Sequence, residues 1–95
     1  MKIGAQGTAD IFNGIDSKAA RKACPASLHA IASRKLQAVN AAAKLSDLRV
    51  PMGNHLHALS HDRAGQYAIK INDQYRICFR WVEGEAVDVE ITDYH

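Results

Sequence analysis

Hydrophobic residues between Pro25 and Lys44 recur at spacings of three and four, the pattern of a helix with one apolar face. Basic and polar residues such as Arg34 and Lys35 lie off this stripe. We therefore expect a helix over residues 25–44 that packs on the core. The stripe consists of Leu28, Ile31, Ala32, Leu36, Val39 and Ala43.

From residue 67 onward the spacing changes to two, which predicts β-strands. Residues 67–71 alternate, residues 72–74 favour a turn, and residues 83–85 favour a hairpin loop. The core-facing positions are expected to be Tyr75, Ile77, Phe79, Trp81, Val87, Val89 and Ile91. The opposite face would carry Arg76, Cys78, Arg80, Asp88, Glu90 and Thr92. The last thirty residues are thus predicted to form an antiparallel β-meander.

The first 24 residues carry weaker signals. Residues 1–5 alternate slightly and favour a short strand. Thr8 is expected to cap a short helix over residues 9–13 that ends at Gly14. Residues 16–23 are basic and rich in alanine, which favours a helix, and Pro25 suits the first turn of the next one.

Residues 45–66 are rich in turn formers, and an ordered loop of this length is often functional. Leu48, Leu56 and Leu59 are expected to hold the segment to the core, with a short strand around residues 56–59. His55, His57 and His61 invite a metal-site interpretation. Because the segment lacks the cysteines and paired acids of typical zinc sites, we expect no metal.

Composition indicates a single globular domain over residues 1–95. Hydrophobic residues make up 47% and charged residues 23%, and no apolar run approaches the ~20 residues of a membrane span. Because no apolar leader segment is visible either, we expect a cytoplasmic protein without membrane contact. Cys24 and Cys78 are predicted to be buried free thiols, as suits a reducing compartment.

Charge is distributed unevenly along the chain. Residues 1–82 hold all 12 lysines and arginines and five acids, a net charge of +7, whereas residues 83–95 hold five acids and no base. A basic body suits a polyanion such as nucleic acid. The alternative is an ordinary solvated surface whose charges intersperse after folding.

The chain ends with Asp93, Tyr94 and His95 directly after a predicted core strand. Tyrosine and histidine are able to exchange protons, and aspartate is able to orient either of them. Arg76, on the preceding strand, suits binding of a phosphate. These groups together suit metal-free RNA cleavage, which needs a base, an acid and a cation. The alternative, in which Tyr94 packs and His95 is solvated, is equally compatible with the residues.

Two stretches of the chain resemble the HigB branch of the RelE/ParE toxin superfamily. They are residues 65–79, GQYAIKINDQYRICF, and residues 87–95, VDVEITDYH. Residues 34–36, 40–42 and 48–54 are similar to upstream motifs of the same branch, so the resemblance covers residues 28–95. It implies an α+β fold, with two N-terminal helices packed on a small antiparallel sheet. It also implies a toxin that cuts translated mRNA in the ribosomal A site without metal or cofactor, and a helix-turn-helix (HigA-like) antitoxin as its partner.

The resemblance carries the family's catalytic positions to Asp93, Tyr94, His95, His57 and Arg76. We expect Arg80, Arg63, His61 and Lys70 to contact RNA. Two departures stand out. Many relatives have lysine and glycine in place of Ser60 and His61, and many have arginine and glutamate around the positions of His55 and His57.

Two other functions remain open from the residues. The ParE branch shares this fold and poisons DNA gyrase by binding, although a terminal Tyr-His pair has no use in such a toxin. The missing lysine favours a third possibility, a weakened toxin that serves mainly as an antitoxin-bound co-regulator of transcription. Translation arrest with cut mRNA, as opposed to a DNA-damage response, distinguishes the first two functions.

Overall fold

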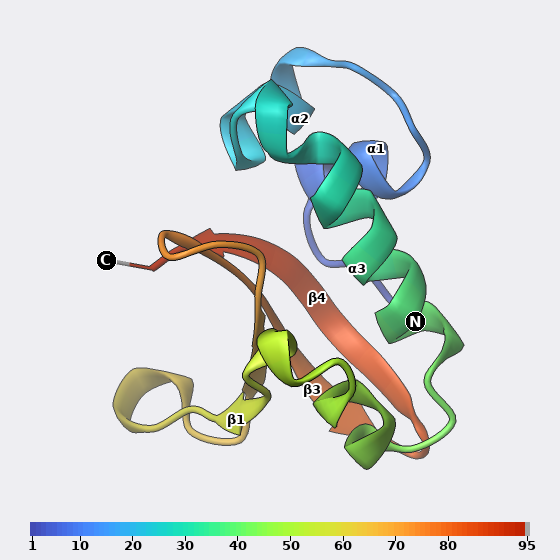
Figure 1. Ribbon diagram of the computed structural model, residues 1–95, viewed down its shortest axis with the longest axis vertical. Helices are drawn as coiled ribbons and strands as arrows, with labels where there is room; N and C mark the ends of the chain where they lie inside the picture. Colours follow the sequence, from blue (N-terminus) through green and yellow to red (C-terminus); the bar gives the residue numbers. More distant parts are fainter. Residues whose placement is uncertain (95) are drawn as a thin grey trace.

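A computed structural model describes residues 1–94, which form an α+β domain (Figure 1). The α-helices are α1 (Gln6–Phe12), α2 (Lys18–Ala23) and α3 (His29–Ala41). The strands are β1 (His57–Ala58), β2 (Tyr67–Lys70), β3 (Tyr75–Val82) and β4 (Glu85–Asp93). Short 3-10 helices complete the chain: η1 (Ala26–Leu28), η2 (Leu45–Arg49), η3 (Met52–Asn54) and η4 (His61–Arg63). The predicted fold class is confirmed, with three α-helices in residues 1–94, as the local pattern predicted, where the family resemblance implied two.

The four strands form an antiparallel sheet in the order β1-β2-β3-β4, which confirms the predicted meander and the short strand near residue 57. The first residues extend the sheet beyond β4 by one parallel bridge, between Ile3 and Val89. Lys2 donates a backbone hydrogen bond to Ala86, and Gly4 donates one to Val89. The strand predicted for residues 1–5 is therefore reduced to a single bridge that protects the edge of β4.

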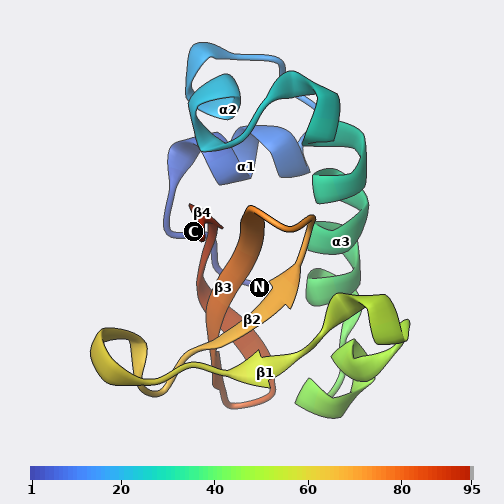
Figure 2. The same ribbon diagram turned by 60° about the vertical axis from the view of Figure 1, so that its left-hand side comes forward.

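The helices cover one face of the sheet, with α1 and α3 on the same side in both views (Figures 1 and 2). Ala32, Leu36 and Val39 of α3 are buried in the core, which confirms the predicted stripe over most of its length. Ala43 is exposed, contrary to expectation, because α3 ends at Ala41 and not near Lys44. The sheet contributes Ile69, Ile71, Ile77, Phe79, Ala86, Val89 and Ile91 to the same core.

Thr8 does not cap a helix as predicted. Helix α1 begins at Gln6, and Thr8 lies within it with only 1% of its surface exposed. Its hydroxyl oxygen instead accepts a hydrogen bond of 3.0 Å from the backbone N–H of Ile91 in β4. The side chain thus satisfies a donor of the sheet and not one of its own helix, a role that local sequence does not reveal.

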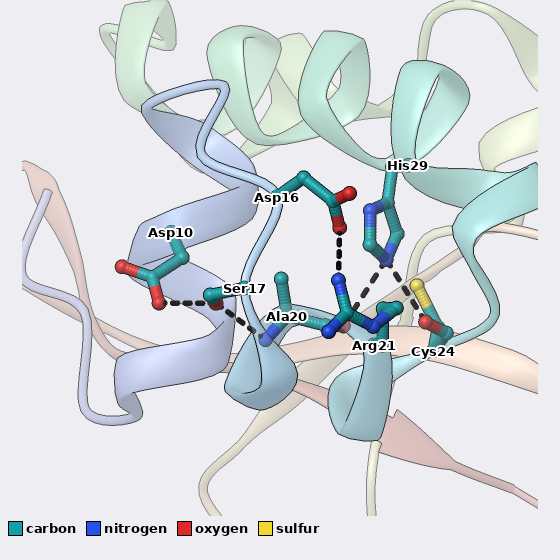
Figure 3. A network of polar contacts seen from close by, with 7 residues as sticks. All are labelled: Asp10, Asp16, Ser17, Ala20, Arg21, Cys24 and His29. Atoms are coloured by element: carbon teal, nitrogen blue, oxygen red, sulfur yellow. Dashed lines mark hydrogen bonds and ion pairs between the residues drawn. The ribbon is translucent and has the colours of Figure 1, made fainter.

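Polar contacts fasten the three helices to one another (Figure 3). The buried Asp10 carboxylate accepts a hydrogen bond of 2.7 Å from the hydroxyl of Ser17, whose oxygen in turn accepts one from the N–H of Ala20 and caps α2. From α3, the His29 ring lies within hydrogen-bond distance of the carbonyl oxygens of Ala20 and Cys24. Ser17 thus caps the N-terminus of α2, and His29 contacts carbonyl oxygens of α2 and of its C-cap residue.

A β-bulge changes which residues of β4 face the core. Asp88 has a φ of +52°, and the pairing with β3 shifts between Cys78 and Arg80. As a result Val87 pairs with Arg80, on the face opposite the core, and Ala86 is buried in its place. The expectation that Val87 faces the core is therefore wrong, because the extra residue reverses the alternation before the bulge.

None of the helices within residues 1–94 is long and apolar enough to cross a membrane. Both cysteines are free and buried, as predicted.

Candidate active site

The face of the sheet that α3 leaves uncovered carries most of the predicted functional residues, and we call it the outer face. Directly paired residues of antiparallel strands share a face. Lys70 pairs with Arg76, and Arg76 pairs with Thr92, which places three polar side chains in one row across β2, β3 and β4. The next row holds Cys78 and Glu90. The predicted outward position of Arg76 is therefore confirmed.

Arg76 and Tyr94 form the centre of this face. The guanidinium carbon of Arg76 lies 5.1 Å from the centroid of the Tyr94 ring, a cation–π contact. Tyr94 is 40% exposed, so its ring remains open to a ligand. No ion pair with Arg76 occurs in the part of the chain that the structure describes.

The turn between β2 and β3 fixes the end of β4 that carries Tyr94. The side-chain oxygen of Asn72 accepts hydrogen bonds from the N–H groups of Gln74 and Tyr75. Gln74 accepts a hydrogen bond of 2.6 Å from the N–H of Tyr94 and donates one from its side chain to Asp93. The predicted Asn72–Gln74 turn therefore also determines where the terminal residues lie.

Arg63 joins the η4 segment to the outer face. Its guanidinium contacts the Glu90 carboxylate of β4 at 3.2 Å and the side-chain oxygen of Gln66 at 3.0 Å. The η4 segment, yellow in Figures 1 and 2, consequently lies on the side of the sheet opposite α3. This ion pair brings together two elements that are 27 residues apart in sequence.

Two cavities meet at Tyr94. One, of about 450 Å³, is lined by Arg63, Thr92, Asp93 and Tyr94. The other, of about 300 Å³, is lined by Leu59, Ser60, His61, Asp62, Arg63 and Tyr94. The structure therefore places His61, Arg63, Asp93 and Tyr94 around one continuous region, with Arg76 against the Tyr94 ring.

Several side-chain atoms of the outer face are buried. Cys78 is fully buried, and this burial raises the pKa of its thiol. The Nε atom of Arg76 and the hydroxyl oxygen of Thr92 are both buried without a well-formed hydrogen bond within residues 1–94. Thr92 was not among the site residues predicted from the sequence. The alternation along the predicted hairpin nevertheless places it on the same face as Arg76.

Acidic residues of β4 neutralise part of the basic body. Asp88 lies 3.6 Å from Arg80, Glu90 pairs with Arg63, and Glu85 pairs with the amino terminus at 3.1 Å. Lys70, expected to contact RNA, is paired with Asp73 at 2.8 Å. The charges of the two ends of the chain thus intersperse, and Arg76 differs from Arg63, Arg80 and Lys70 in lacking an ion pair in residues 1–94.

His57 shares the outer face through its pairing with Ala68, in the row of Cys78 and Glu90, but it lines neither of the two cavities at Tyr94. It lies on β1, with ring Nδ1 2.9 Å from the carbonyl oxygen of His55, and lines a separate cavity of about 360 Å³ with Arg49 and Tyr67. Within residues 1–94 no three His, Cys, Asp or Glu residues come together as a metal site. His95 lies outside the described residues.

Comparison with known proteins gives a clear family. Residues 11–95 match the family model described as the RelE-like toxin of the type II toxin–antitoxin system HigB. The chain belongs to this family of HigB toxins.

Three known proteins are similar over about two thirds of the chain. A Vibrio cholerae protein named toxin HigB-1 is 41% identical over 64 residues, which are 67% of each chain. A Proteus vulgaris protein named endoribonuclease HigB is 33% identical over 61 residues, which are 64% of this chain and 65% of that protein. An uncharacterised Haemophilus influenzae protein is 34% identical over 61 residues and matches over 60% of its length.

Membership of the family confirms the resemblance found in the sequence. A toxin of a type II module is partnered by an antitoxin, so this chain has an antitoxin partner. The roles of the individual site residues remain predictions, and the geometry of the outer face supports some of them more than others.

Proposed function

We propose that this HigB toxin is an endoribonuclease that cuts translated mRNA on the ribosome and thereby arrests translation. The observation that carries the proposal is the contact between Arg76, without an ion pair in residues 1–94, and the half-exposed Tyr94 at the end of β4. A guanidinium beside a phenol supplies a cation for phosphate and a group able to move a proton. The Proteus vulgaris relative is named an endoribonuclease, which supports the same activity.

The reaction that suits these groups is attack of a ribose 2′-oxygen on the adjacent phosphorus. A base removes the 2′-hydroxyl proton, a new P–O bond forms, and the P–O5′ bond breaks while an acid protonates the leaving oxygen. Tyr94 and His95 are the candidates for proton transfer, and Asp93 orients them. Arg76 stabilises charge on the pentacoordinate phosphorus. This step requires no metal, and we propose that cleavage is metal-independent.

His57 is the least supported of the proposed catalytic residues. It lines a different cavity from Tyr94 within the isolated toxin. RNA that runs across the outer face from Tyr94 to β1 would bring it into reach. We therefore propose His57 as a second proton-transfer group only for RNA that spans both cavities.

The partners follow from this activity. We propose a helix-turn-helix antitoxin, the ribosome and its mRNA, and hence a cytoplasmic location. The neutral Ser60, where many relatives carry lysine, motivates one alternative, a weakened toxin that acts mainly through its antitoxin.

The test is to map mRNA 5′ ends in a purified translation system after addition of toxin. Arg76→Ala should lower the cleavage rate on the order of 100-fold, because a charge-assisted hydrogen bond is worth about 1.5–3 kcal/mol. Lys18→Ala, an exposed charge of α2, is the matched control and should change the rate little. Equal effects would show that the basic surface acts diffusely and has no site at Arg76.

His95→Ala and His95→Gln test the proton-transfer role. Each should lower cleavage by about 10²–10⁴-fold while the melting temperature and antitoxin binding stay unchanged. Chelation with EDTA followed by restoration of magnesium for the ribosome should leave cleavage intact. Intact mRNA with wild-type toxin, or a DNA-damage response in cells, would overturn the proposed function.

A further inference from the structure

We propose that the η4 segment and Tyr94 form a binding subsite for one nucleobase, with guanine as the preferred base. This inference rests on the proposed RNA-cleaving function and adds to it the means of reading sequence. The subsite is the cavity of about 300 Å³ lined by residues 59–63 and Tyr94. That volume is at the lower end of the range for ligand pockets, as suits a single base.

Contacts within the toxin itself fix the loop that forms the cavity wall. Leu59 donates a backbone hydrogen bond of 2.8 Å to Gln66, which closes the loop at its base. The contact of Arg63 with Glu90 ties the loop to β4. His61 adopts a φ of +54°, an uncommon backbone conformation outside glycine that recurs at ligand sites.

Tyr94 provides a stacking surface for the base. Single-stranded RNA is read by stacking unpaired bases on aromatic rings and by hydrogen bonds to their Watson–Crick edges. Arg76 contacts the Tyr94 ring but lines neither of the two cavities at Tyr94. The ring therefore has surface in contact with the cation and surface that faces the cavity.

The Asp62 carboxylate determines which Watson–Crick edge the subsite is able to bind. Its side chain is exposed, and within residues 1–94 it has neither an ion pair nor a hydrogen bond. A carboxylate repels phosphate, so its presence between the basic residues His61 and Arg63 is unfavourable for a site that holds only the RNA backbone. Carboxylates accept two hydrogen bonds side by side. Guanine alone among the four bases presents two adjacent donors, N1–H and N2–H, on its Watson–Crick edge.

Arg63 does not compete with Asp62 for the guanine edge, because a guanidinium offers only N–H donors and cannot accept the N1–H and N2–H groups, and its Nη1 already contacts Glu90 and Gln66. The polar groups left to read the base are those of Ser60, His61 and Asp62. Asp62 is thus the specificity-determining residue of the subsite, while Tyr94 gives affinity without selecting among bases.

The first arm of the test needs no cleavage. Amide shifts of ¹⁵N-labelled toxin are followed during titration with GMP and, separately, with UMP. GMP should shift residues 59–63 and bind at least 5-fold more tightly than UMP. Asp62→Asn, which keeps the shape but replaces one acceptor by a donor, should abolish that difference. Asp16→Asn, an exposed carboxylate on the α1–α2 loop, is the matched control and should retain it.

The second arm counts cleavage sites on mRNA by the base at each codon position. Wild type and Asp16→Asn should favour guanine at one position by on the order of 10-fold, and Asp62→Asn should lose the preference. Equal binding of GMP and UMP, or an unchanged preference in Asp62→Asn, overturns the subsite. If GMP is preferred but no mRNA is cut, the subsite stands and the proposed nuclease function fails.

Discussion

The hydrogen bond between α1 and β4 lends itself to a sharp test of how the fold is held together. Thr8 is buried, and its hydroxyl oxygen accepts the N–H of Ile91 at 3.0 Å. Thr8→Val replaces the hydroxyl by a methyl group of nearly the same size. The substitution therefore opens no cavity, but it leaves a buried backbone donor without an acceptor.

The expected cost follows from that unsatisfied donor. A buried polar group that loses its partner destabilises a protein by about 1–3 kcal/mol. For a domain of this size each kcal/mol lowers the melting temperature by about 4–8 °C. Thr8→Val should therefore unfold at a clearly lower temperature, with a lower free energy of unfolding and an unchanged denaturant m-value.

The same substitution elsewhere in the chain is the control. Thr92 is the other threonine, and its buried hydroxyl oxygen lacks a well-formed hydrogen bond within residues 1–94. Thr92→Val should leave stability unchanged or raise it, because an unsatisfied polar atom is replaced by an apolar one. Urea unfolding of both variants measures the contrast. Equal stability of Thr8→Val and wild type would refute the assigned hydrogen bond.

Three further perturbations probe packing, burial and loop attachment. Gly7→Ala should lower the free energy of unfolding by more than the about 1–3 kcal/mol that overpacking usually costs, because its Cβ would lie 2.3 Å from the Ala19 carbonyl oxygen. Gly53→Ala is the control: its Cβ would have nothing within 4 Å, so thermal melting should be nearly unchanged. Burial raises the pKa of Cys78 above its ordinary 9.0, so folding favours the protonated thiol. The stability that this thiol contributes to the folded state is therefore fully present below pH 9 and is lost as pH rises. Urea midpoints should consequently fall more steeply above pH 9 in wild type than in Cys78→Ala, and parallel slopes would contradict this. Asn54→Ala should lower the free energy of unfolding by about 1–3 kcal/mol, because it removes the side-chain hydrogen bonds to the carbonyl oxygens of Leu48 and Val50. An unchanged urea midpoint would show that these two bonds do not hold the loop in place.

Local pattern was sufficient for the parts of the fold whose periodicity is set by near neighbours. The alternation from Tyr75 to Trp81 predicted β3 and the outward direction of Arg76, because side chains of a strand alternate whatever the strand pairs with. The stripe of Ala32, Leu36 and Val39 predicted α3 in the same way. The family was indicated separately, by the resemblance of residues 65–79 and 87–95 to HigB toxins, and the comparisons established it.

Tertiary structure alone decided the contacts between distant segments. Thr8 meets a backbone group 83 positions away, and Arg63 meets Glu90 27 positions away, so no local spacing encodes either pair. Val87 faces away from the core because the bulge at Asp88 is a property of the pairing between two strands. The cavities beside Tyr94 likewise exist only once η4 is fastened to the sheet. Sequence therefore determined which elements form and, away from the bulge, which side chains share a face, whereas folding decided which of those side chains surround one site.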